Sequence, residues 1–214
     1  MSLIAVLALV ASLGAQELDV QKLVEELYPK NDRMKKMRVG EMVRELGIHA
    51  GSRVADVGCG TGEFSLVLAK VVGPTGKVTC VDVDSLGEAR RHFRKNGVKV
   101  TTVKGADDDP KLASASVDAV LMVNAYHEME MFEPMLRHIR EALKPQGRLV
   151  ICDNTPHRTA ARPRDSQTKN HVIAEALVVA DLESAGFRIL RRDSGFVDDP
   201  DSESQHWLIV ATPR

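Results

Sequence analysis

A glycine-rich loop placed directly after an apolar run constrains the fold of this chain most strongly. Residues 54–57 (VADV) predict a buried strand, and Gly58, Gly60 and Gly62 follow it in a G-x-G-x-G spacing. A helical pattern begins immediately afterwards, with apolar residues at 64, 67, 68 and 71. Such a strand–loop–helix unit lets backbone N–H groups approach a ligand without an intervening Cβ atom. The loop therefore predicts a nucleotide-type ligand at the end of the first strand.

The rest of the chain repeats this alternation of strand and helix. Apolar runs predict further strands at 78–83, 98–103, 119–123 and 148–152, and a final strand pair at 187–190 and 207–211. Helical patterns separate most of these runs, whereas the polar segment 153–168 predicts a long loop. Alternating strands and helices are typical of an α/β protein with a doubly wound, mostly parallel sheet, here of seven strands.

The length of 214 residues suits one α/β domain with an N-terminal addition. Residues 1–16 contain an uncharged apolar run with no Lys or Arg before it, which is compatible with a signal peptide, a membrane anchor or an N-terminal helix. Residues 17–47 carry helical patterns broken at Pro29 and predict a helical cap in which Met34, Met37 and Met42 pack, with the lining of a substrate pocket as the alternative for these flexible side chains. Residues 48–214 form the predicted ligand-binding domain.

Charge and cysteine content argue against several classes of function. The 29 basic and 30 acidic residues nearly cancel, so no general positive field exists to bind a phosphate backbone, and no nucleic acid partner is expected. The cysteines Cys59, Cys80 and Cys152 are dispersed and lack metal-ligand spacing. We expect three reduced core thiols and no metal site.

Two acidic residues indicate which kind of nucleotide the loop binds. Glu63 occupies the position of the third glycine in the G-x-G-x-x-G pattern, and its carboxylate would repel a pyrophosphate. This disfavours the alternative of an NAD(P)-dependent oxidoreductase. Asp82 ends the second strand, twenty residues after Gly62, where a carboxylate can accept hydrogen bonds from both ribose hydroxyls.

These motifs together resemble those of class I S-adenosylmethionine-dependent methyltransferases. The stretch 54–62 (VADVGCGTG) is similar to the family's first motif, 105–118 to its adenine-binding segment and 143–149 (LKPQGRL) to its L-K-P-G-G-x-L turn. The resemblance implies a Rossmann-like methyltransferase fold with an antiparallel last strand and S-adenosyl-L-methionine as the methyl donor. The family's usual aspartate in the adenine segment is Ala106 here, which leaves Asp107 or Asp108 for the adenine contact. The donor-binding residues that follow are Asp56, Gly58, Gly60, Gly62, Asp82, Val83, Asp107, Asp108 and Asn124.

The fourth strand ends in 123–129 (VNAYHEM), and ligands of such sheets bind at the carboxyl ends of strands. Tyr126 is placed to lie near the sulfonium or to shape the acceptor pocket, and His127 or Glu128 to take a proton from the acceptor. The alternative is that the Tyr-His pair only packs and caps a helix. His157 and His171 are weaker candidates for the same role.

The predicted function is methyl transfer to a small molecule, or to a quinone or lipid-like acceptor, by in-line displacement. Because the donor already has a good leaving group, close and aligned reactants can supply much of the rate without a base. A donor-binding protein without catalysis stays an alternative. We expect a cytoplasmic protein, because the donor is made inside cells, with membrane contact only where the N-terminal apolar segment is retained. The oligomeric state is not predicted.

Overall fold

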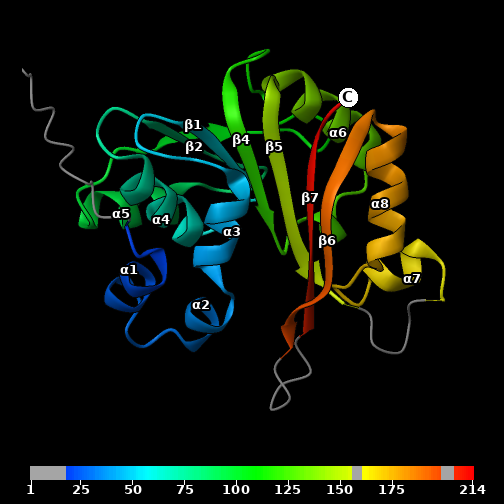
Figure 1. Ribbon diagram of the computed structural model, residues 1–214, viewed down its shortest axis with the longest axis horizontal. Coiled ribbons are helices and arrows are strands. Elements are labelled where there is room, and N and C mark those ends of the chain that lie inside the picture. Colours follow the sequence, from blue (N-terminus) through cyan, green and yellow to red (C-terminus); the bar gives the residue numbers. More distant parts are fainter. Residues whose placement is uncertain (1–17, 156–160, 199–204) are drawn as a thin grey trace, which may run out of the picture.

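The computed structural model describes residues 18–155, 161–198 and 205–214, and is organised around one seven-stranded sheet of order β3-β2-β1-β4-β5-β7-β6 (Figure 1). Strands β1 to β5 pair in parallel, whereas β7 pairs antiparallel with both β5 and β6. The predicted doubly wound sheet with an antiparallel last strand is confirmed. The strands are β1 Arg53–Val57, β2 Lys77–Asp82, β3 Thr101–Lys104, β4 Val117–Val123, β5 Leu143–Asn154, β6 Phe187–Asp198 and β7 Gln205–Pro213.

Helices cover both faces of this sheet. The helices are α1 Val20–Leu27, α2 Asp32–Lys36, α3 Val39–Leu46, α4 Glu63–Val72, α5 Gly87–Lys95, α6 Phe132–Ala142, α7 Arg164–Thr168 and α8 Glu175–Ser184, with a 3₁₀ turn η1 at Tyr126–Glu128. Successive residues of a strand point to opposite faces. Accordingly, Val54 packs in the core beneath α3 and α4, and Ala55 packs in the core beneath α6 and α8. Figure 1 shows these two helix layers on either side of the strands.

The N-terminal helices share the core of the sheet. Met34, Met37 and Met42 are buried in the same apolar cluster as Val54, which confirms that these methionines pack. The second predicted helical pattern divides into α2 and α3 at Arg38, whose φ of 50° interrupts the helix. The guanidinium of Arg38 lies 4.6 Å from the centre of the Phe196 ring and donates to the Phe196 carbonyl. This contact with β6 is distant in sequence, so the local pattern does not reveal it.

Three other elements differ from the sequence prediction. Strand β3 begins at Thr101 rather than at residue 98, and the short helix α7 lies in the segment predicted as a loop. Strand β6 continues to Asp198, because it follows β7 through two irregularities in register. Residues 1–17, which include the possible signal or anchor, lie outside the described residues. Within the described part of the chain, no helix is long and apolar enough to cross a bilayer.

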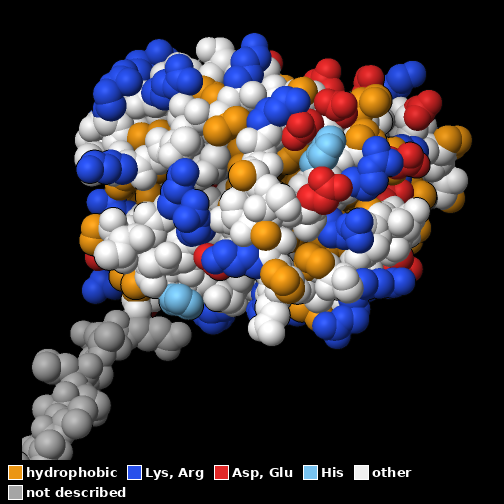
Figure 2. All heavy atoms as spheres, turned by 90° about the horizontal axis from the view of Figure 1, so that it is seen from above, with side chains coloured by type: hydrophobic (Ala, Val, Ile, Leu, Met, Phe, Trp, Pro, Cys, Tyr) orange, Lys and Arg blue, Asp and Glu red, His pale blue; other side chains and the backbone are white. Residues whose placement is uncertain are grey.

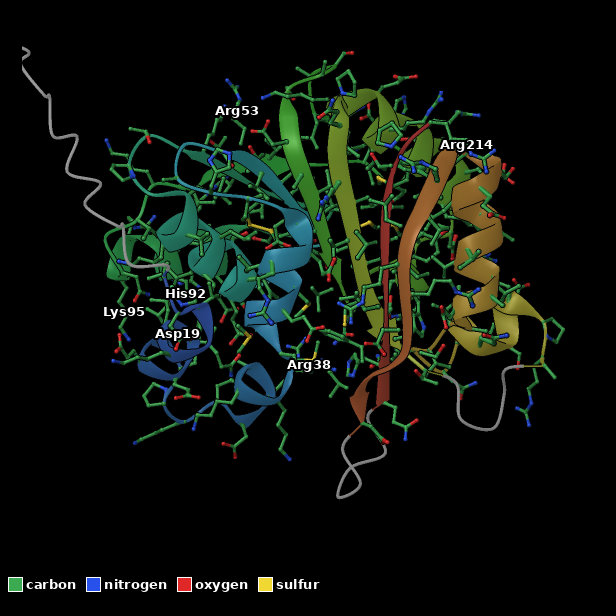
Figure 3. The ribbon with its side chains drawn as sticks, in the orientation of Figure 1. Asp19, Arg38, Arg53, His92, Lys95 and Arg214 are labelled. Carbon is green, nitrogen blue, oxygen red and sulfur yellow. A yellow bond between two sulfur atoms is a disulfide. The ribbon has the colours of Figure 1, made fainter. Side chains whose placement is uncertain are left out.

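The amino and carboxyl ends of the parallel strands lie on opposite sides of the molecule. Arg53, at the start of β1, and Arg214 lie on the same side of the molecule in Figure 3, and Arg38 lies toward the opposite side. Figure 2 views the side on which the parallel strands begin, where basic, acidic and apolar side chains all reach the surface. The carboxyl ends of the parallel strands therefore lie on the side away from the viewer in Figure 2.

Candidate active site

A cavity of about 750 Å³ lies where β1, β2 and β4 end, which is within the range of small-molecule sites. Its walls come from the glycine loop, the end of β2, residues 105–107, and the segment from Asn124 to Met131 that includes η1. Of the residues predicted from the sequence, the cavity is lined by Gly58, Gly60, Asp82, Val83, Asp107, Asn124 and Glu128. It is not lined by Asp56, Gly62, Asp108, Tyr126 or His127.

The three glycines of the loop serve different purposes. All three have positive φ angles, of 77° at Gly58, 49° at Gly60 and 83° at Gly62. A Cβ atom on Gly58 would lie 2.3 Å from the Ala125 side chain, and one on Gly62 would lie 2.5 Å from the Phe93 ring. A Cβ atom on Gly60 would meet nothing within 4 Å. Gly62 is therefore required for packing against α5, whereas Gly60 borders open space in the cavity.

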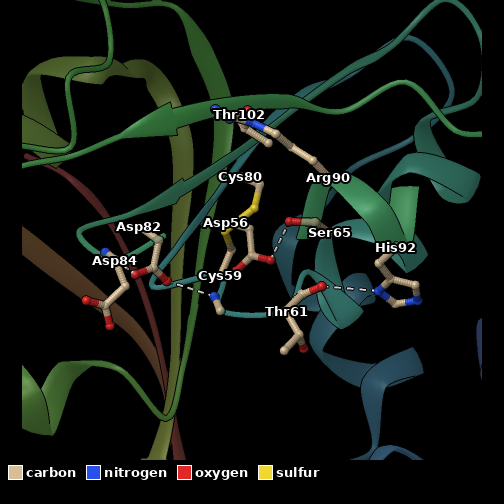
Figure 4. Close-up of a disulfide and its surroundings, with 11 residues drawn as sticks. Asp56, Cys59, Thr61, Ser65, Cys80, Asp82, Asp84, Arg90, His92 and Thr102 are labelled. Carbon is tan, nitrogen blue, oxygen red and sulfur yellow. Dashed lines mark hydrogen bonds between the residues drawn. A yellow bond between two sulfur atoms is a disulfide. The ribbon is translucent and has the colours of Figure 1, made fainter. Parts of the chain in front are cut away.

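Asp82 holds the loop in place from the end of β2. Its Oδ2 accepts a hydrogen bond of 2.8 Å from Gly60 N, and its Oδ1 accepts one of 2.9 Å from Asp84 N (Figure 4). The neighbouring Val83 is an apolar residue with 45% of its surface exposed at the cavity. The predicted carboxylate thus lies at the cavity wall beside an apolar surface.

Asp56 was predicted to contact the donor, but it does not line the cavity. It is 1% exposed and its Oδ2 accepts a hydrogen bond of 2.7 Å from the Ser65 hydroxyl, away from the cavity (Figure 4). Burial raises the pKa of Asp56 to about 6, although the Ser65 hydrogen bond acts in the opposite direction. Asp56 therefore joins β1 to α4 beneath the loop.

The prediction of three reduced cysteines is wrong for two of them. Cys59 and Cys80 form a disulfide between the loop and β2, and only Cys152 is a free, buried thiol (Figure 4). Gly58 N and Cys59 N both donate to the Val81 carbonyl, which brings the loop back against β2. Cysteines 21 residues apart meet because adjacent parallel strands place their ends side by side.

The acidic segment after β3 offers one carboxylate to the cavity. Asp107 lines it, whereas Asp109 accepts hydrogen bonds of 2.7 and 2.8 Å from the backbone N and Nζ of Lys111. Asp108 is held by its carbonyl oxygen, which lies 3.0 Å from His138 Nδ1. Of the two residues left open for the adenine contact, the geometry favours Asp107.

Asn124 places an unsatisfied acceptor at the cavity. Its backbone has a φ of 50°, and its N–H donates to the Cys152 carbonyl at 2.9 Å. Its Oδ1 is buried and has no hydrogen-bond partner among the described residues. Because buried polar atoms in folded proteins nearly always have partners, this oxygen is suited to a donor group on a ligand.

Tyr126 was expected to face the cavity, but it does not line it. It is fully buried, and its hydroxyl donates a hydrogen bond of 2.8 Å to Asp181 on α8. Arg164 of α7 pairs with the same carboxylate. Burial, with the adjacent charge of Asp181, raises the pKa of Tyr126 well above its usual value. Tyr126 thus connects η1 to α7 and α8, which agrees with the packing alternative for this residue.

His127 is buried beneath the cavity and is oriented by a carboxylate that the sequence analysis did not identify. Its Nδ1 lies 2.6 Å from Asp153 Oδ1, and its backbone N–H donates to Asp153 Oδ2 at 3.1 Å. Asp153, at the end of β5, is completely buried. Burial alone lowers the pKa of His127, but the hydrogen bond and charge of Asp153, with Glu128, outweigh it and raise that pKa.

His171 completes a group of side chains around Glu128. His127 Nε2 and His171 Nδ1 each lie 3.6 Å from Glu128 Oε1, and the two imidazole rings are 5.7 Å apart between centres. The structure therefore brings together His127, Glu128 and the weaker candidate His171, whereas His157 lies outside the described residues. The sequence analysis missed Asp153 because no motif contains it, and because it is the first residue of the polar segment 153–168 that was predicted as a loop.

Comparison with known proteins agrees with this geometry. The profile of a methyltransferase domain family matches residues 54–147. A crystal structure of an S-adenosylmethionine-dependent methyltransferase from Aquifex aeolicus has a TM-score of 0.73 and 25% identity, and covers 91% of this chain and 98% of its own. A [4+2]-cyclase shares the fold, with a TM-score of 0.68, 17% identity and coverage of 91% and 92%.

Among curated proteins, the demethylmenaquinone methyltransferase of Staphylococcus aureus is 26% identical over 154 residues, which is 68% of this chain. The match spans 64% of the length of that relative. The family and its solved relatives imply S-adenosyl-L-methionine as the cosubstrate, in agreement with the glycine loop and Asp82. Residues 54–147 thus match a methyltransferase domain, and in strand order and cavity the chain is similar to class I S-adenosylmethionine-dependent methyltransferases.

Proposed function

We propose that this protein transfers a methyl group from S-adenosylmethionine to a small-molecule acceptor. The observation that carries the proposal is the contact between Asp82 and Gly60 N, which puts a carboxylate and an uncovered loop backbone on one cavity. The cavity volume of about 750 Å³ leaves room for a donor and part of an acceptor. The residues at the cavity fit the donor's chemistry, because it carries hydroxyl and amino donors but no phosphate.

In this proposal different cavity residues contact different parts of the donor. Asp82 accepts hydrogen bonds from the ribose hydroxyls while it continues to hold the loop. Asp107 binds the adenine edge, and Val83 contacts an adenine face. The unpartnered Oδ1 of Asn124 accepts a hydrogen bond from a donor N–H group. Gly60 allows the backbone to approach the donor closely.

The acceptor enters from the side of η1. When bound, the donor supplies an electrophilic methyl group on a sulfonium that leaves as a thioether. Met129, Met131 and Met135 line this part of the cavity, and Met131 is 49% exposed. Flexible methionines suit an acceptor with an apolar body. The name of the Staphylococcus relative agrees with a quinone-like acceptor, which we include among the candidates.

His127 and Glu128 provide the polar groups at this end. Asp153 holds His127 so that Nε2 is directed toward Glu128, and Glu128 lines the cavity. A histidine oriented by a buried carboxylate is the arrangement expected of a group that takes a proton. Alignment of donor and acceptor supplies the rest of the effect. Because the donor is made inside cells, we place this activity in the cytoplasm.

The test begins with donor binding. Calorimetry of the full chain with S-adenosylmethionine and its demethylated product should show saturable binding, and Asp82→Asn should weaken both. Acceptors are then screened with methyl-labelled donor, beginning with naphthoquinols, phenols, thiols and amines. Absence of donor binding by a folded protein would contradict the proposal.

One alternative has a specific observation behind it. The [4+2]-cyclase shows that this fold also serves proteins named for another reaction. Donor binding without methyl transfer to any acceptor of the panel would favour such a role. Labelled product formation by the wild type, lost in Asp82→Asn, would exclude it.

A further inference from the structure

Three side chains with metal-binding atoms meet beside the cavity. Glu128 Oε1 lies 3.6 Å from His127 Nε2 and 3.6 Å from His171 Nδ1. The ligand atoms of the three residues all lie within 4.8 Å of one another. They come from η1 and from the segment before α8, and Glu128 and His171 are 43 positions apart in the sequence.

The two separations from Glu128 are close to those of a metal centre. In a tetrahedral site with bonds of about 2.0–2.1 Å, two ligand atoms are about 3.4 Å apart, close to the observed 3.6 Å. Two imidazoles and one carboxylate form the ligand set of several zinc enzymes, and they leave a fourth position open. Mg²⁺ and Ca²⁺ prefer oxygen ligands and are not suited to this set.

The surroundings support the same interpretation. Asp153 binds His127 at Nδ1, which leaves the lone pair of Nε2 directed toward Glu128. A carboxylate behind a histidine in this way fixes the ring and its tautomer at many metal sites. On the other side, Asn154 Nδ2 donates to the His171 carbonyl at 3.0 Å and holds that segment to the end of β5. His171 has a φ of 55°, a conformation that requires support from its neighbours.

Burial within the group is uneven. His127 is 4% exposed, whereas the side chains of Glu128 and His171 are 64% and 73% exposed. An ion can therefore enter from solvent and still be bound by one rigid, buried ligand. Glu128 also lines the donor cavity, so the ion would border the place where the acceptor enters.

We propose that His127, Glu128 and His171 bind one Zn²⁺-type divalent cation whose open position binds the methyl acceptor. The acceptor part of this proposal depends on the proposed methyltransferase function, and it revises the sequence-based expectation of no metal site. His127 Nε2 then binds the metal instead of taking a proton. The acceptor belongs to the class of compounds with a hydroxyl or thiol group, because these bind zinc as anions.

The chemistry balances without a further reactant. The cation lowers the pKa of the bound hydroxyl or thiol, whose O–H or S–H bond breaks, and the proton passes to solvent. An electron pair of that oxygen or sulfur forms the bond to the methyl carbon. The bond from this carbon to the sulfonium breaks, and its electron pair stays on the departing thioether sulfur.

Metal binding itself is the first test. The full chain, freed of metal, is titrated with Co²⁺ by visible absorption and with Zn²⁺ in competition with a chromophoric chelator. We expect one tight equivalent that Mg²⁺ does not displace. His171→Ala and Glu128→Gln should weaken binding at least about a hundredfold, and Asp153→Asn about ten- to a hundredfold. The control His49→Ala removes an exposed histidine outside the group and should bind as the wild type does.

Absence of saturable binding, or equal affinities in all these variants, would overturn the metal site. Because the variants at Glu128 and His171 alter exposed side chains, they are expected to fold. Addition of acetohydroxamate should change the Co²⁺ spectrum, and an unchanged spectrum would contradict the open position. Donor binding, measured separately, distinguishes the two proposals: Asp82→Ala should lose donor affinity and retain Co²⁺, whereas His171→Ala should do the reverse.

Discussion

The donor side and the acceptor side of the cavity both depend on a buried aspartate, but they use it differently. On the donor side, Asp56 is bound by the Ser65 hydroxyl, and burial raises its pKa to about 6. On the acceptor side, Asp153 is bound by the imidazole and backbone N–H of His127 and raises the pKa of that histidine. A buried carboxyl with a neutral partner supports a loop, whereas one with an ionisable partner controls the chemistry of that partner.

Replacing His127 should have the largest effect. We expect His127→Ala to lower the methyl-transfer rate by about a hundredfold or more and to leave donor affinity nearly unchanged, because the side chain acts on the acceptor side only. This holds whether Nε2 takes a proton or binds a cation. Single-turnover kinetics and donor calorimetry on the same sample measure both quantities. A rate per folded molecule equal to that of the wild type would make His127 a packing residue.

The buried Asp56 should make stability depend on pH. Its pKa is 3.8 in the unfolded reference and about 6 in the folded state, so its stabilising contribution is complete below pH 3.8 and is lost as pH rises through 6. The loss amounts to about 3 kcal/mol at most. Asp56→Asn removes this titration. Urea unfolding between pH 4 and 7 should therefore show the variant gaining stability relative to the wild type, and parallel curves would contradict the raised pKa.

Asp82 should affect the donor side alone. Asp82→Ala removes the acceptor of Gly60 N and the proposed ribose contact, so donor affinity should fall by about 1.5 to 3 kcal/mol. Calorimetry measures the change, with circular dichroism to establish that the variant is folded. Unchanged affinity would contradict the assignment of Asp82 to the ribose.

The smallest effect is expected at Tyr126, which serves as the matched control for His127. Tyr126→Phe removes the hydroxyl that binds Asp181 and should cost about 1 kcal/mol of unfolding free energy. The rate per folded molecule should stay within about twofold of the wild type, because this hydroxyl is directed away from the cavity. A large loss of rate would bring Tyr126 back into the acceptor site.

The sequence by itself determined the alternation of strands and helices, the glycine loop and the acidic residue that ends β2. These features are local, because burial on a parallel sheet requires apolar runs and a close approach to a ligand requires glycine. The sequence did not determine which of the predicted residues reach the cavity. Gly60 and Asp82 line it, whereas Asp56 contacts Ser65 of α4 and Gly62 packs against Phe93 of α5.

Only the tertiary structure decided the acceptor side. Asp153, His127 and His171 belong to three separate segments; the sequence marked the two histidines as candidates but neither Asp153 nor the contacts among the three. They meet because β4 and β5 are parallel neighbours whose ends coincide, and because Asn154 binds the segment that precedes α8. The disulfide between Cys59 and Cys80 has the same origin, in the adjacent ends of β1 and β2. Side-chain partners across strands depend on register, and register is set by the packing of the whole sheet.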